Sequence, residues 1–175
     1  MQSNQSTSAL PPRRAALPVE RFAWRVAAPL DFVINLAING GIAAWLFRGL
    51  PRVSLTSGLS VASMVVPMSF LLCAITTLFG WWNAVRERRS GRVTPPLPPG
   101  TPWLGRAMVD GLAAGAVALA VTWLATVAAE ATVPQATVSS GMATAGVGLL
   151  AGLLGYCFHG RAVSRGGRIG TLPTR

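Results

Sequence analysis

Three polar residues recur at every fourth position in an apolar stretch near the N-terminus: Asp31, Asn35 and Asn39. Residues at this spacing lie on one face of an α-helix, so the sequence predicts a polar stripe about 12 Å long. A carboxylate followed by two amides could bind a proton or cation and line a hydrated path. The same groups could instead bond neighbouring helices and stabilise their packing. We favour the packing role, because Asp31 lies near the helix end, where Arg25 could pair with it.

Asp110 and His159 raise the same question elsewhere in the chain. Asp110 lies four residues after Arg106, and this spacing favours an ion pair on a helix surface. We expect that pair to anchor a helix end rather than to relay protons. His159 is the single histidine of the chain, and one histidine cannot supply a metal site on its own. We expect no carboxylate pair near His159, and we expect His159 itself to lie at the end of a helix.

The chain lacks the sequence patterns of common catalytic sites. No G-x-S-x-G, H-E-x-x-H or phosphate-binding loop is present. The two cysteines, Cys73 and Cys157, fall inside apolar stretches and belong to no haem or zinc motif. The sequence therefore predicts a protein that is not an enzyme and that holds no cofactor or metal.

Four long apolar stretches must position these polar groups. The chain of 175 residues is 51% hydrophobic and only 11% charged. A helix of about 20 apolar residues crosses the hydrocarbon core of a bilayer, which is about 30 Å thick. The six tryptophans lie at or near the ends of the stretches, where indole rings prefer the membrane interface. The predicted spans are residues 27–47, 59–82, 107–129 and 138–158.

The arginines indicate how these spans are oriented. All 15 basic residues are arginine, and 13 of them lie in the two tails or in the loop between the second and third spans. By the positive-inside rule these segments are cytoplasmic, so both termini should lie inside. We expect residues 1–24 to form a disordered cytoplasmic tail, 25–160 the membrane domain and 161–175 a basic cytoplasmic tail. Because the arginines flank apolar spans, the net charge of +10 does not indicate a nucleic-acid partner.

Small residues predict where the helices pack. Gly111 and Gly115 form a G-x-x-x-G pattern in the third span, and Gly148 and Gly152 form another in the fourth. Small residues at this spacing let helices approach closely. In the fourth span the small face extends to further positions, namely Gly141, Ala145 and Gly155. We expect an all-α membrane fold in which spans one and two, and spans three and four, form two antiparallel hairpins.

The run from Asp31 to Gly40, DFVINLAING, resembles a D-F-x-I-N-x-x-I-N-G pattern on the first helix of small uncharacterised bacterial membrane proteins. The resemblance implies a four-span protein of the bacterial cytoplasmic (inner) membrane. It transfers no catalytic residues to this chain.

These observations predict an integral membrane protein that acts without catalysis, through helix packing, as an interaction or accessory protein. An alternative is a small oligomeric transporter or channel that uses the Asp31, Asn35 and Asn39 face. The expected partners are the lipid bilayer and either further copies of the chain or another membrane protein.

Overall fold

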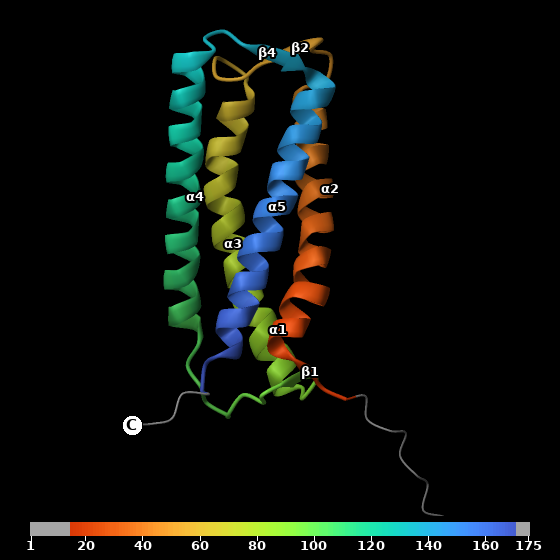
Figure 1. Cartoon of the computed structure of the whole chain (residues 1–175), viewed down its shortest axis with the longest axis vertical. Helices are drawn as coiled ribbons and strands as arrows, with labels where there is room; N and C mark the ends of the chain where they lie inside the picture. Colours follow the sequence, from red (N-terminus) through yellow and green to blue (C-terminus); the bar gives the residue numbers. More distant parts are fainter. Residues whose placement is uncertain (1–14, 171–175) are drawn as a thin grey trace, which may run out of the picture.

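The computed structural model describes residues 15–170, which form an all-α fold dominated by four long helices (Figure 1). The first helical run is continuous and consists of α1 (Val19–Phe22), the π-helical turn η1 (Ala23–Ala27) and α2 (Ala28–Leu46). The other three helices are α3 (Val61–Arg89), α4 (Leu104–Thr132) and α5 (Ser140–Gly167). Each of the four runs has 28 or 29 residues and is long and apolar enough to cross a membrane.

Short strand pairs join the loops at the two ends of the helices. β1 (Leu17–Pro18) pairs in parallel with β3 (Val93–Thr94), and β2 (Arg52–Ser54) pairs antiparallel with β4 (Thr137–Ser139). We call these the β1/β3 end and the β2/β4 end. The described chain starts and finishes at the β1/β3 end, where the loop between α3 and α4 also lies (Figure 1).

The helices do not pack in chain order. α5, the last helix, lies in the middle and packs against both α2 and α3, while α4 packs along α3 on the far side (Figure 1). The expected pairing into two hairpins is therefore not supported, because the main neighbour of the first span is the fourth. Several glycines suit this arrangement: Gly148, Gly152 and Gly155 of α5 face α2, and Gly111 and Gly115 of α4 face α3.

The helices extend beyond the apolar stretches that predicted them. Residues 15–24, expected in a disordered tail, include β1, α1 and the start of η1, and α5 continues to Gly167 inside the expected basic tail. The two extensions are hydrogen-bonded to each other: Ser164 Oγ of α5 donates to Glu20 Oε2 of α1 at 2.8 Å. The outer parts of both predicted tails, residues 1–14 and 171–175, lie outside the described residues.

A buried arginine joins three segments at the β1/β3 end. The Arg88 side chain is 1% exposed. Its guanidinium donates to the carbonyl oxygens of Pro95 at 2.7 Å, Gly166 at 2.7 Å and Ile169 at 3.0 Å. The last turn of α3 thereby holds both the loop to α4 and the end of α5. From the sequence, Arg88 is predicted only to be one of the cytoplasmic arginines. In the fold its side chain is buried and hydrogen-bonds to neighbouring segments.

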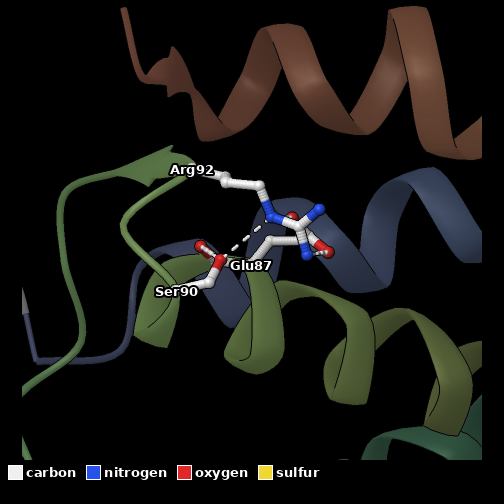
Figure 2. A network of polar contacts seen from close by, with 3 residues as sticks. All are labelled: Glu87, Ser90 and Arg92. Atoms are coloured by element: carbon white, nitrogen blue, oxygen red, sulfur yellow. Dashed lines mark hydrogen bonds and ion pairs between the residues drawn. The ribbon is translucent and has the colours of Figure 1, made fainter. Parts of the chain in front are cut away.

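The chain turns after α3 through a second polar network (Figure 2). Arg92 pairs with Glu87 through two contacts, Nε to Oε2 at 2.8 Å and Nη2 to Oε1 at 2.9 Å. Ser90 Oγ donates to the Glu87 carbonyl at 2.9 Å and lies 3.2 Å from Arg92 Nε. These contacts fold the chain back so that β3 reaches β1.

Candidate functional site

The polar stripe of α2 lies against α5. Asn35 is 8% exposed and Asn39 is 9% exposed. The facing surface of α5 is glycine: a Cβ placed on Gly155 would lie 2.7 Å from both Asn35 Nδ2 and Asp31 Oδ2. The absence of a side chain at Gly155 is therefore what lets the stripe fit between the two helices.

Hydrogen bonds run along the stripe within α2. Asn35 Nδ2 donates to the Asp31 carbonyl at 2.9 Å and to Asp31 Oδ2 at 2.8 Å. Asn39 Nδ2 donates to the Asn35 carbonyl at 3.0 Å. The side-chain amides of Asn35 and Asn39 thus make their hydrogen bonds within α2. From the sequence, hydrogen bonds to other helices are expected instead.

His159 of α5 completes the site. Its Nδ1 lies 3.3 Å from Asp31 Oδ1, and the residue is 7% exposed. Neither ring nitrogen has a hydrogen bond within residues 15–170, so the 3.3 Å contact lacks the alignment of a hydrogen bond. The sequence predicts no carboxylate pair near His159, and the structure places a single carboxylate there, that of Asp31. Within residues 15–170 Asp31 is paired with His159 rather than with Arg25, the partner considered from the sequence. The contact brings an imidazole and a carboxylate together in a mostly buried interface between α2 and α5.

A signal for this pair was present in the sequence. Asp31 lies six residues after Arg25, and His159 lies six residues before Arg165. In antiparallel helices whose arginines share one interface, these positions reach the same depth. The turn η1 precedes the pair and places Trp24 against Gly160, where a Cβ would lie 2.5 Å from Trp24 Cζ3. π-helical turns of this kind are frequent at functional sites.

Asp110 forms a separate polar contact between helices. Trp81 Nε1 of α3 donates to Asp110 Oδ2 at 3.0 Å, and Arg165 of α5 forms an ion pair with Asp110 Oδ1. The expected partner, Arg106, is therefore replaced by an arginine from another helix. Asp110 joins α3, α4 and α5 near the β1/β3 end.

The glycines singled out in the sequence lie in helix contacts. A Cβ on Gly111 would lie 2.9 Å from the Ala74 carbonyl oxygen, and one on Gly115 would lie 2.8 Å from that of Phe70. Gly148 and Gly152 face α2 in the same way, through Gly40 and Phe32. The small face of α5 begins later than expected, because a Cβ on Gly141 would meet nothing within 4 Å and Ala145 is exposed.

Among residues 15–170 no three His, Cys, Asp or Glu side chains gather where they could hold a metal ion. Comparison of the chain with protein families, curated proteins and solved structures found no match. The geometry of the chain itself must therefore support any proposal about its function.

Proposed function

We propose that this chain is a non-catalytic accessory protein of a bacterial cytoplasmic membrane, with both termini in the cytoplasm, that binds a transmembrane helix of another protein. The orientation is supported by the arginines, most of which lie at the β1/β3 end of the described chain. The binding role is supported by one observation in particular, an apolar groove along the seam between α3 and α4.

The groove consists of three hollows that follow one another along the seam. The first, of about 220 Å³, lies between Trp82 and Leu104. The second, of about 160 Å³, includes Ile75 and Leu112, and the third, of about 320 Å³, includes Phe70 and Trp123. The lining residues of all three hollows are apolar.

The length of the groove suits a membrane-spanning ligand. Leu104 and Trp123 are 19 residues apart on α4, which corresponds to about 28 Å of helix. This is close to the hydrocarbon thickness of a bilayer, about 30 Å. Exposed small residues line its third hollow, namely Ala116 and Ala120. Such residues allow the backbone of another helix to approach, so we assign the groove to a helix rather than to acyl chains.

Photocrosslinking in native membranes tests this assignment. A photoreactive residue placed at Leu112 or at Ala120 should give a discrete protein adduct, identified by mass. The matched control is Val121, which is 61% exposed on α4 and lines none of the three hollows. An adduct with a second copy of the chain, lipid adducts alone, or equal yields at all three positions would contradict the proposal.

The alternative function, a small oligomeric transporter or channel, has its own supporting observation. His159 is buried beside Asp31, and neither of its ring nitrogens has a hydrogen bond within the described residues. Intramembrane ionisable groups frequently mark ion pathways. Proton flux into liposomes that contain the purified protein tests it. Flux that is lost in Asp31→Asn, with Asp110→Asn as the control, would support transport; absence of flux in the native protein would contradict it.

A further inference from the structure

We propose that an open cleft between α4 and α5 at the β1/β3 end binds the phosphate headgroup of an anionic phospholipid. Both helices pack on α3, and the cleft between them consists of two adjoining cavities of about 570 and 230 Å³. The cavities share three lining residues: Asp110, Ala113 and Arg165. Trp81 and Thr77 of α3 also line it. This surface is separate from the groove between α3 and α4.

The mouth of the cleft is positively charged. It is lined by four arginines and one carboxylate: Arg106, Arg161, Arg165, Arg168 and Asp110. Asp110 forms an ion pair with Arg165 and accepts a hydrogen bond from Trp81, and Arg168 forms an ion pair with Glu20. Within residues 15–170, no carboxylate lies within ion-pair distance of Arg106 or Arg161. Arg106 lines the larger cavity and Arg161 the smaller one, so each cavity has an exposed guanidinium that can donate in a bidentate manner to phosphate oxygens.

Beyond the arginines the cleft becomes apolar. Its walls include Val117, 11 residues beyond Arg106 on α4, and Phe158, three residues before Arg161 on α5. At the helical rise these walls reach about 4–16 Å past the arginines, where the upper part of the acyl chains lies below a headgroup. A free phosphate ion would leave this part empty, whereas a phospholipid fills both parts. We therefore assign the site to a lipid.

A buried hydroxyl in the cleft has no partner. Thr77 is 3% exposed, and its Oγ1 makes no hydrogen bond within the described part of the chain. It lines the smaller cavity, which Val117, Phe158 and Arg161 also line. The ester carbonyl oxygens of a phospholipid lie directly below its phosphate and are acceptors for such a donor. A bound lipid would thus satisfy the one cleft hydroxyl that the protein leaves unbonded.

The test is thermal unfolding of the full-length protein in maltoside micelles doped with phosphatidylglycerol or with phosphatidylcholine of the same chain length. Phosphatidylglycerol should raise the melting temperature saturably and phosphatidylcholine should not, because a ligand of the native state alone stabilises it. Inorganic phosphate in undoped micelles forms the third arm. Equal shifts with the two lipids would overturn the proposal, and an equal shift with inorganic phosphate would overturn the assignment to lipid.

Charge-matched variants separate a site from general surface attraction. Arg106→Gln with Arg161→Gln should raise the apparent Kd for phosphatidylglycerol about fivefold per arginine, on the order of the contribution of an arginine near anionic lipid. The control, Arg21→Gln with Arg89→Gln, removes the same charge from exposed positions that do not line the cleft. Equal losses in the two double variants would overturn the proposal. Ala113→Leu, which narrows both cavities without a change of charge, should also weaken binding; unchanged affinity in this variant would overturn the proposal as well.

Discussion

Gly115 of α4 lies against the backbone of Phe70 on α3, so closely that a Cβ on the glycine would be 2.8 Å from the Phe70 carbonyl oxygen. A main-chain atom cannot swing aside as a flexible side chain can. The separation of α3 and α4 is therefore set by the hydrogen atom that glycine carries in place of a side chain.

Gly115→Ala should push these two helices apart. We expect it to lower the free energy of unfolding by about 1–3 kcal/mol, the usual cost of overpacking. Thermal or denaturant unfolding in detergent micelles measures it. Gly146→Ala is the control, since a Cβ there would meet nothing within 4 Å, and it should leave stability unchanged or slightly raised. Equal stabilities for the two variants would show that α4 is not in close contact with α3.

The Asp31–His159 contact predicts coupled effects. His159→Leu alone leaves the carboxylate without its neighbour in an apolar interface, and we expect a clear loss of stability. Adding Asp31→Asn should recover part of that loss, with a coupling energy of about 0.5–3 kcal/mol, as found for residues in contact. The measurement is a double-mutant cycle on unfolding in detergent. Purely additive effects would mean that the two side chains do not interact.

Substitution of Arg88 should lower the stability of the fold strongly, although this residue lies near one end of the helices. Arg88→Met removes the donor of several carbonyl groups, and a buried group that loses its partner costs about 1–3 kcal/mol. We expect a total loss of about 2–4 kcal/mol and faster proteolysis in the loop 90–100. Its exposed neighbour Arg89, changed to methionine, should have little effect on either measurement. A stable Arg88→Met variant with a protected loop would contradict the structural role of this arginine.

The orientation can be tested by labelling in spheroplasts. Single cysteines at Ser57 and Gln135, in a background with Cys73→Ala and Cys157→Ala, should react with an impermeant maleimide from outside. A cysteine at Thr94 should react only after the membrane is opened. All three positions are exposed in the fold, so a difference in labelling reports the side of the membrane. Labelling of Thr94 in closed spheroplasts would reverse the proposed orientation.

The four spans and their polar face could be predicted because they depend on local composition. Long apolar runs become helices in lipid, and the spacing of Asp31, Asn35 and Asn39 places them on one face of any helix. The partner of that face could not be predicted, because all four spans are similarly apolar. Glycine spacing indicates which side of a helix packs closely, but not which helix it meets.

His159 illustrates why the predicted site was incomplete. The apolar run of the last span stops at Phe158, before Arg161, which placed His159 just past the end of the predicted span. The helix in fact continues to Gly167, because its end is held by Arg88 and Glu20. Hydropathy locates the charged residues at which an apolar run ends. It does not show where tertiary hydrogen bonds stabilise further turns of the helix. His159 is the first residue of this extension, which adds about two and a half turns, and it lies beside Asp31.

The central position of α5 has a consequence for biosynthesis. The ribosome releases the first three spans before the helix that both α2 and α3 pack against exists. Until then the carboxylate of Asp31 and the guanidinium of Arg88 lack the partners that the last segment supplies. A chain that stops before Ser140 is therefore an incomplete bundle, which also lacks the glycine face of α5 that covers the stripe of α2. Completion of the chain and completion of the fold coincide.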